Sequence, residues 1–149
     1  MQIPAQSLRF SIFQGISVKQ NGQNLSFPWA GGMNSMQYQS MDLNGDGVMD
    51  MVCFDRTSNQ VSTFLQDSRG DFTFAPGYAM KFPVIENWFA MADYNQDGRK
   101  DLFCSSAAGI KVYQNKSVNG QIYFEKVKDP LYTKGFTGLI NLYVASPDI

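Results

Sequence analysis

Two short acidic segments carry the side chains that could do chemistry in this chain of 149 residues. The first reads Asp-Leu-Asn-Gly-Asp-Gly-Val-Met-Asp over residues 42–50, and the second reads Asp-Tyr-Asn-Gln-Asp-Gly-Arg-Lys-Asp over residues 93–101. Each places an oxygen-bearing side chain at positions 1, 3, 5 and 9 and glycine at position 6. Calcium loops share this spacing and add the backbone carbonyl of position 7. The predicted ligands are Asp42, Asn44, Asp46, Val48 (carbonyl) and Asp50 in the first loop, and Asp93, Asn95, Asp97, Arg99 (carbonyl) and Asp101 in the second.

The ligand chemistry favours Ca²⁺ at both sites. Oxygen ligands in a flexible cage suit Ca²⁺, whereas Mg²⁺ demands a stricter octahedron and transition metals recruit nitrogen or sulfur. Three carboxylates held ~5 Å apart would repel by roughly 3 kcal/mol per pair at an effective dielectric of 20, so a cation would stabilise the loop. The alternative is a pair of Asx-type turns that bind nothing. An EF-hand is disfavoured, because Cys53 and Cys104 stand at position 12, where that motif needs Glu.

The two loops belong to a longer repeat with an offset of 93 − 42 = 51 residues. Beyond the loops, Val52 aligns with Phe103 and Cys53 aligns with Cys104 at that offset. Runs rich in Val, Phe, Tyr and Thr, separated by turn residues, predict strands. The predicted strands are 37–43, 51–55, 60–66 and 72–78 in the first unit, and 88–94, 102–105, 110–115 and 122–127 in the second. Four strands in each ~50-residue unit are typical of a propeller blade.

Composition agrees with an all-β fold. Glu86 and Glu125 are the only Glu residues among 13 acidic residues, and the chain contains 12 Phe, 7 Tyr and 13 Gly. Glu favours helices, while aromatic residues favour strands and Asp, Asn and Gly favour turns. We therefore predict an all-β chain, a β-propeller fragment with about two four-stranded blades and partial flanking blades. The expected divisions are an N-terminal hairpin and linking turn over 1–35, repeats over 36–86 and 87–138, and a truncated third repeat over 139–149.

The flanking segments support this division. Asn21-Gly22 lies between two extended runs and predicts a tight β-hairpin. Residues 140–145 predict the opening strand of a third repeat, and Asp148 stands either at the start of a third loop or just before one. Because a propeller needs about four to eight blades to close, we expect the chain to be a piece of a larger protein, with the remaining blades as its partners.

Several function classes are excluded or disfavoured by residue types. The chain has no His, which removes Ser-His-Asp and Cys-His catalysis and His-ligated zinc. A net charge of −1 without a basic run argues against nucleic acid as a partner. No stretch approaches the ~20 apolar residues of a membrane-spanning helix, so membrane insertion is not expected. Residues 1–10 lack the features of a signal peptide, which we expect to lie outside this chain.

The pattern D-x-N-x-D-G-x-x-D, followed by a short apolar strand and recurring after 51 residues, resembles the FG-GAP/VCBS-type repeat. The match covers about residues 36–127, and no clean Phe-Gly…Gly-Ala-Pro signature is present, so the chain stands nearer the VCBS branch than integrin α-subunits. Segments 25–32, 54–57 and 109–113 are similar to bacterial surface proteins that carry a C-terminal sorting domain. The resemblance implies a seven- or eight-bladed propeller with Ca²⁺ between the first two strands of each blade.

The remaining reactive or aromatic residues have simpler expected roles. We expect Cys53 and Cys104 to be buried free thiols, because equivalent points on adjacent blades lie too far apart for a disulfide. The aromatic set, including Trp29 and Trp88, is expected to pack between blades, although a sugar-stacking surface is the alternative. Nothing places Glu86 and Glu125 at glycosidase spacing. The dipeptide Asp55-Arg56 predicts a turn with a solvated ion pair.

These observations lead to one main functional hypothesis and two alternatives. The main hypothesis is a non-enzymatic, calcium-stabilised propeller segment of a secreted or cell-surface bacterial protein, serving adhesion or the binding of a protein or glycan ligand. No catalytic residues are predicted. The alternatives are a carbohydrate-binding, lectin-like propeller and the non-catalytic part of a secreted polysaccharide-degrading enzyme. Exposed aromatic residues beside a polar pocket would favour the lectin.

Overall fold

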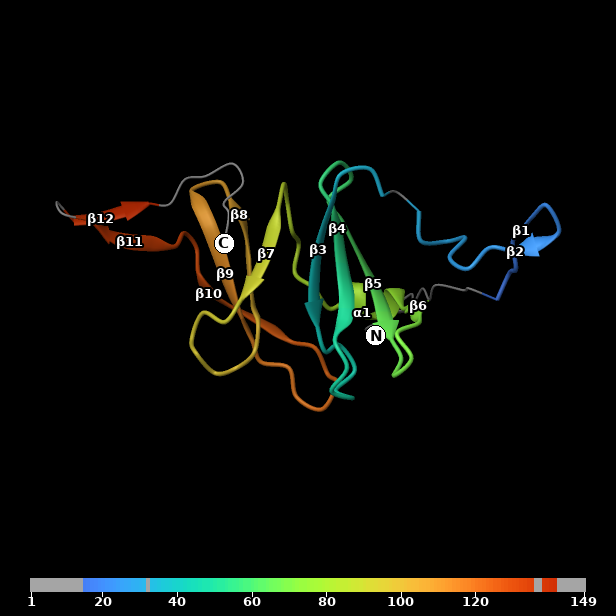
Figure 1. Cartoon of the computed structure of the whole chain (residues 1–149). Helices are drawn as coiled ribbons and strands as arrows, with labels where there is room; N and C mark the ends of the chain where they lie inside the picture. The colour runs from blue at the N-terminus through green and yellow to red at the C-terminus, as the bar shows by residue number, and fades with distance from the viewer. Residues whose placement is uncertain (1–14, 32, 136–137, 142–149) are drawn as a thin grey trace, which may run out of the picture.

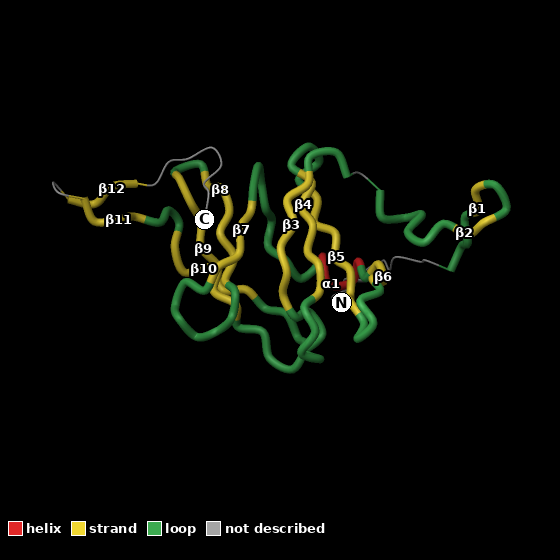
Figure 2. The backbone as a smooth tube through the Cα atoms, viewed as in Figure 1, coloured by secondary structure: helices red, strands yellow, loops and turns green. Residues whose placement is uncertain are grey.

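Two four-stranded antiparallel sheets stand side by side at the centre of the molecule, and a small hairpin extends from each end (Figure 1). The computed structural model describes residues 15–31, 33–135 and 138–141. Strands and connecting loops account for nearly all of the described backbone, as Figure 2 shows. The prediction of an all-β propeller fragment is confirmed.

Each sheet is a meander in which consecutive strands pair. In the first sheet the order is β3 (Met36–Met41), β4 (Asp50–Asp55), β5 (Gln60–Gln66) and β6 (Phe72–Phe74). In the second the order is β7 (Phe89–Ala92), β8 (Asp101–Ser106), β9 (Gly109–Asn115) and β10 (Phe124–Lys128). The two long inner strands of each sheet are the most buried, as their Val- and Phe-rich sequences lead one to expect.

The first sheet departs from prediction at its outer edge. The strand predicted over 72–78 ends at Phe74, and residues Pro76–Ala79 form a single helical turn, α1. Proline explains the change, because its ring fixes φ near the helical value and it has no N–H to donate to a sheet. The prediction was therefore wrong for residues 75–78.

Two short hairpins flank the sheets. Strands β1 (Lys19–Gln20) and β2 (Gln23–Asn24) pair around Asn21-Gly22, whose positive φ values of 51° and 79° confirm the predicted tight turn. At the other end β11 (Tyr132–Gly135) pairs with β12 (Gly138–Asn141), a hairpin that was not predicted. Residues 142–149, which include most of the predicted third-repeat strand and Asp148, lie outside the described residues.

The main hydrophobic core lies between the two sheets. Val52 and Phe54 of β4 face Phe89 of β7 and Leu102 of β8, and all four side chains are buried. The rings of Phe54 and Phe89 meet edge-to-face with centroids 5.6 Å apart. Burial of each such side chain contributes about 1.5–3 kcal/mol. The stability of either sheet therefore depends on the other.

The outer faces show that the sheets are stacked in the same orientation. Val52 faces the second sheet, whereas its counterpart 51 residues later, Phe103, packs on the outer face of that sheet. Conversely Cys104 faces the first sheet, and its counterpart Cys53 lies on the outer face of the first sheet. Equivalent residues of the two sheets therefore point in the same direction along the stack. This is the arrangement of successive propeller blades.

The two cysteines are free and buried, as predicted. They lie in different clusters on different faces of their sheets. Burial raises the pKa of both thiols to about 11. Both side chains therefore act as small hydrophobic groups in the neutral form.

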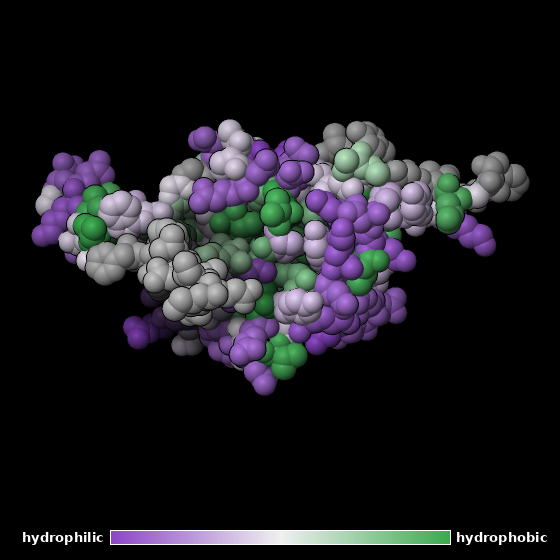
Figure 3. Space-filling view, turned by 180° about the vertical axis from the view of Figure 1, so that it is seen from behind, coloured by the Kyte–Doolittle hydropathy of each residue, from purple (hydrophilic) through white to green (hydrophobic). Residues whose placement is uncertain are grey.

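The aromatic residues divide between core and surface. Trp88 is 1% exposed and packs against Phe103 and Val112 on the outer face of the second sheet, so it is buried but does not lie between the two sheets. Trp29 is 48% exposed and donates its indole N–H to the carbonyl of Ile16 at 3.1 Å, so the packing prediction was wrong for this residue. The reverse side of the molecule mixes hydrophilic surface with hydrophobic patches (Figure 3). Within the described residues, no helix has both the length and the apolar character needed to cross a membrane.

Candidate functional site

The two acidic loops occupy the same place in each sheet. The first connects β3 to β4 and the second connects β7 to β8, and both lie at the lower edge of the molecule in Figure 1. The last acidic residue of each loop, Asp50 or Asp101, is also the first residue of the following strand. The 51-residue offset therefore relates two equivalent sites.

The first loop is held by carboxylate and amide oxygens that accept hydrogen bonds from its own backbone. The carboxylate of Asp42 accepts from the N–H groups of Gly45 at 2.7 Å and Gly47 at 2.9 Å. Asp46 accepts from the N–H of Val48 at 2.7 Å, and Asn44 accepts from the N–H of Asp46 at 3.0 Å. These bonds wind the chain into successive Asx turns around its acidic side chains.

The second loop repeats most of this hydrogen-bond scaffold. Asp93 accepts from the N–H groups of Asp97 at 3.1 Å and Gly98 at 2.8 Å, and Asp97 accepts from the N–H of Arg99 at 2.9 Å. The glycines at position 6 have nearly the same φ, 85° at Gly47 and 84° at Gly98. Glycine adopts this left-handed conformation without steric cost, which explains its presence at both positions.

The acidic residue at position 9 is buried beneath each loop. Asp50 is 1% exposed, and its two carboxylate oxygens accept from the N–H groups of Leu43 at 2.7 Å and Gln66 at 2.8 Å. Asp101 is fully buried and accepts from the N–H groups of Tyr94 at 2.9 Å and Asn115 at 2.7 Å. Each carboxylate therefore ties the start of the loop to the end of the third strand, a structural role that sequence reasoning missed.

The acidic side chain at position 5 of each loop is held in its ionised form. The side-chain amide of Asn44 and the N–H of Val48 lower the pKa of Asp46. The amide of Asn95, the N–H of Arg99 and the Arg99 side chain lower the pKa of Asp97 to about 2. Hydrogen bonds to the charged form favour ionisation, so both groups are carboxylates at neutral pH.

Position 7 makes the two loops unequal. Arg99 turns back to its own loop, where its Nη2 lies 2.7 Å from Oδ2 of Asp97. The Arg99 side chain therefore neutralises part of the negative charge of its own loop. The first loop has Val48 at this position, so Asp46 has no such internal cation. An added cation would compete with Arg99 in the second loop only.

The donor chemistry of both loops fits a hard divalent cation, because every predicted ligand atom is an oxygen. Asp42, Asn44 and Asp46 would supply side-chain oxygens in the first loop, and Val48 would supply its carbonyl. Within the described part of the chain, however, three or more His, Cys, Asp or Glu side chains nowhere converge in a metal-holding group. Asp50 and Asp101 already accept two backbone hydrogen bonds each, so their role as ligands remains a prediction.

Sequence reasoning also missed the polar contacts that join the two repeats. Oε1 of Gln37 in β3 accepts from the N–H of Phe89 in β7 at 2.9 Å. Nε of Arg56 donates to the carbonyl of Asn87 at 2.8 Å. Asp55 is 1% exposed and accepts from the N–H groups of Ser35 and Thr57, so the predicted solvated Asp55–Arg56 ion pair is wrong. The Gln37–Phe89 and Arg56–Asn87 contacts join residues 52 and 31 positions apart, and no local motif marks them.

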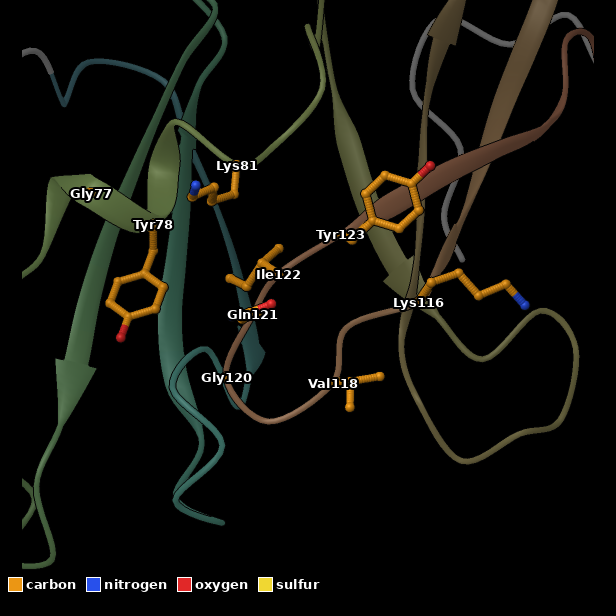
Figure 4. A pocket seen from close by; sticks show the side chains of 9 residues that line it. All are labelled: Gly77, Tyr78, Lys81, Lys116, Val118, Gly120, Gln121, Ile122 and Tyr123. Carbon is orange, nitrogen blue, oxygen red and sulfur yellow. The ribbon is translucent and has the colours of Figure 1, made fainter. Parts of the chain in front are cut away.

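A hollow lies between α1 and the segment that joins β9 to β10. Its volume is about 810 Å³, and Tyr78, Lys81, Lys116, Gln121 and Tyr123 are among its lining residues (Figure 4). Tyr123 is 60% exposed. The hollow therefore combines aromatic rings with cationic and amide groups that can form hydrogen bonds.

Comparison with known proteins identifies the repeat. Residues 42–104 match the family described as FG-GAP-like repeat. The matched segment begins at the first residue of the first acidic loop and ends three residues after the second loop, within β8. No curated protein and no solved structure matches the chain.

Proposed function

We propose that this chain, an FG-GAP-type repeat protein, is a non-enzymatic, calcium-stabilised segment of a β-propeller. In this proposal one Ca²⁺ binds each acidic loop and holds together the first two strands of its blade. The ligands are Asp42, Asn44, Asp46, Asp50 and the Val48 carbonyl in one loop, and Asp93, Asn95, Asp97, Asp101 and the Arg99 carbonyl in the other. The metal has a structural role, and no step of chemistry is assigned to it.

The proposal rests chiefly on the match between the two loops. Two segments 51 residues apart share the same ligand types, the same glycine conformation and three equivalent backbone hydrogen bonds. Turns that served only to reverse the chain would not require carboxylates at both positions 1 and 5 of each loop, because Asn and Ser form such turns without mutual repulsion. A bound divalent cation accounts for the excess of negative charge.

We further propose that the protein acts outside the cell, as part of a secreted or surface protein that serves adhesion or ligand binding. Extracellular calcium modules need only ~10⁻⁴–10⁻³ M affinity, because calcium is abundant there. This part of the proposal rests on the resemblance to surface proteins with the same repeat. Protease treatment of intact cells of the source organism, followed by detection with an antibody to this segment, tests it: protection of the segment would contradict a surface location.

Calcium titration tests the metal sites. At 10 mM Ca²⁺ and Kd values of ~10⁻⁴–10⁻³ M, mass action stabilises the fold by about 1.4–2.7 kcal/mol per site. We expect the melting temperature to rise with Ca²⁺, and isothermal titration calorimetry to show two sites. Asp46→Ala and Asp97→Ala should each remove one site, whereas Asp71→Ala, an exposed acidic residue outside the loops, should remove none. A melting temperature that Ca²⁺ leaves unchanged would contradict the proposal.

A lectin-like function is a second candidate, supported by the hollow between the repeats. Its exposed Tyr123 offers a ring on which a sugar could stack, and Lys81, Lys116 and Gln121 offer hydrogen-bond donors. A glycan array probed with the folded chain tests this candidate. Binding that Tyr123→Ala abolishes would support it, and binding to no glycan would count against it. The same module could serve as the non-catalytic part of a polysaccharide-degrading enzyme.

A further inference from the structure

The turn that joins β9 to β10 lies against the acidic loop of the preceding repeat. A Cβ atom placed on Gly120 would lie 2.1 Å from the carbonyl oxygen of Asn44 and 2.8 Å from its carbonyl carbon. Reciprocally, a Cβ atom on Gly45 would lie 2.9 Å from the backbone nitrogen of Gly120. Neither position has room for a side chain, because the opposing atoms belong to the backbone. Two glycines therefore allow the two repeats to touch backbone to backbone.

Backbone conformation alone does not explain the first of these glycines. Gln96 occupies the position of Gly45 in the second loop, since 96 − 45 = 51, and it has a φ of 59°. This site in the loop therefore accepts a positive φ and a side chain together. Glycine is needed at position 45 because of the contact with Gly120.

Gly70 shows the same point for the turn. It lies in the turn between β5 and β6, the first-repeat counterpart of the turn that contains Gly120, with a φ of 93°. A Cβ atom on Gly70 would meet only the side-chain nitrogen of Gln66, at 3.8 Å. Gly70 and Gly120 thus share a left-handed backbone, but only Gly120 presses against another repeat.

Backbone hydrogen bonds hold the turn Val118–Gln121 in place. Val118 and Gln121 exchange backbone hydrogen bonds of 3.2 and 3.0 Å, and Asn119 and Gly120 between them both have positive φ values. The N–H of Lys116 donates to the carbonyl of Tyr123 at 2.8 Å, which closes the base of the turn. The turn can therefore act as a fixed support.

The contact lies at the border between the two acidic loops. A cavity of about 310 Å³ beside it is lined by Asp42 and Gly45 of the first loop, Arg99 and Lys100 of the second, and Asn119 and Gly120 of the turn. At the same border Nζ of Lys100 donates to Oγ of Ser40 at 3.1 Å. A change in the shape of the first loop would therefore displace residues of the second repeat.

We propose that the turn Val118–Gln121 positions the first acidic loop for cation binding through the backbone contact between Gly45 and Gly120. The turn supplies no ligand. It fixes the peptide of Asn44, whose side chain is a predicted ligand, and so couples cation binding in the first repeat to docking of the second. This inference rests on the proposed calcium function. By linkage the coupling is reciprocal, so Ca²⁺ in the first loop also tightens the contact between the repeats.

The test uses the full chain with Asp97→Ala as background, so that calorimetry with CaCl₂ reports on the first loop alone. Gly120→Ala should weaken calcium affinity of that loop about five- to tenfold, within the usual range of coupling between sites. Gly45→Gln, which copies the residue that the second loop carries, should also weaken it. Gly70→Ala is the matched control, since it adds the same strain at positive φ without a clash, and affinity should stay unchanged.

A second measurement separates this inference from the calcium hypothesis. Amide hydrogen exchange in EDTA reports on the N–H groups of Gly47 and Val48, which donate within the first loop. Gly120→Ala should accelerate their exchange, and Gly70→Ala should not. If wild-type protein binds no Ca²⁺, the proposed function fails, while faster exchange still supports the positioning role of the turn. If neither Gly120→Ala nor Gly45→Gln changes exchange or affinity, the inference is wrong. Gly45→Gln keeps the test valid should Gly120→Ala not fold.

Discussion

Gln37 of the first sheet and Phe89 of the second are joined by a hydrogen bond of 2.9 Å from the Phe89 N–H to the Gln37 side-chain oxygen. Phe89 is 1% exposed, so its N–H has no access to solvent as an alternative partner. The bond lies beside the edge-to-face contact between Phe54 and Phe89. Polar and apolar contacts thus meet at one residue, and together they hold the two repeats in register.

Loss of the Gln37 oxygen should destabilise the fold. Gln37→Ala leaves the buried Phe89 N–H without an acceptor, at a cost of about 1–3 kcal/mol. We expect a lower urea midpoint with an unchanged denaturant slope. Gln37→Glu is the control, because its carboxylate can accept the same bond. Equal midpoints for Gln37→Ala and wild type would show that the bond does not contribute.

The ring pair at the core should show measurable coupling. We expect Phe54→Leu and Phe89→Leu each to lower the free energy of unfolding. The double variant should lose less unfolding free energy than the sum of the two single losses. The difference should be about 0.5–1.5 kcal/mol, the usual coupling of an edge-to-face pair. A double-mutant cycle by urea unfolding measures it. Strict additivity would mean that the rings contribute only through their buried area.

The buried acidic residues should matter without any metal. Asp50→Asn and Asp101→Asn each place an amide NH₂ where a carboxylate oxygen accepts a backbone N–H, so one buried donor loses its partner. We expect each variant to lose about 1–3 kcal/mol of unfolding free energy in EDTA. Asp71→Asn, on the surface, should stay within about 0.5 kcal/mol of wild type. If Asp50→Asn were as stable as wild type in EDTA, the Asp50 carboxylate would have no structural role and could act only as a metal ligand.

The two loops should bind Ca²⁺ with different strength if the proposed function holds. Arg99 already pairs with Asp97, whereas Val48 leaves Asp46 without a cation in the first loop. Substituting the residue of each loop into the other tests this difference in calcium affinity. Arg99→Val should raise affinity at the second loop, and Val48→Arg should lower it at the first, each roughly two- to fivefold, as for an exposed ion pair. Calorimetry in Asp46→Ala or Asp97→Ala backgrounds assigns each site, and no change in either variant would contradict the prediction.

The buried thiols should make stability fall at high pH. The folded pKa of Cys104 is raised from 9.0 to about 11, so the unfolded state loses this proton first. The contribution of the thiol is complete below pH 9 and is lost as pH rises toward 11. We expect the difference in stability between wild type and Cys104→Ala to shrink across that window in urea melts. A difference independent of pH from 8 to 11 would contradict the raised pKa.

Local patterns were sufficient where the physical cause is local. Asn21-Gly22 specifies its hairpin because both residues adopt positive φ readily, and Gly47 and Gly98 permit the sharp bend of each acidic loop for the same reason. The burial of the free thiols of Cys53 and Cys104 was predictable because both residues stand in apolar strands. The strand prediction failed at residues 75–78, where aromatic content outweighed Pro76.

Contacts between repeats were beyond the reach of such patterns. Gln37 is an ordinary polar residue in sequence, and only packing of the sheets shows that it reaches Phe89. Gly45 and Gly120 are far apart in the chain, and their close approach exists only once the two repeats are stacked. The sequence pattern at Asp50 does not distinguish a metal ligand from a buried hydrogen-bond acceptor. The structure shows the second role, because the Asp50 carboxylate accepts two backbone N–H groups beneath the loop.

The repeat, the strand content and the oxygen-rich loops were predictable from the amino-acid sequence, because these depend on backbone preference, residue composition and short-range spacing. The tertiary structure decided which face of each sheet meets its neighbour, which carboxylates are buried and which turn supports which loop. Those features depend on contacts between residues tens of positions apart, and the stacking of one sheet on the next is what brings such residues together.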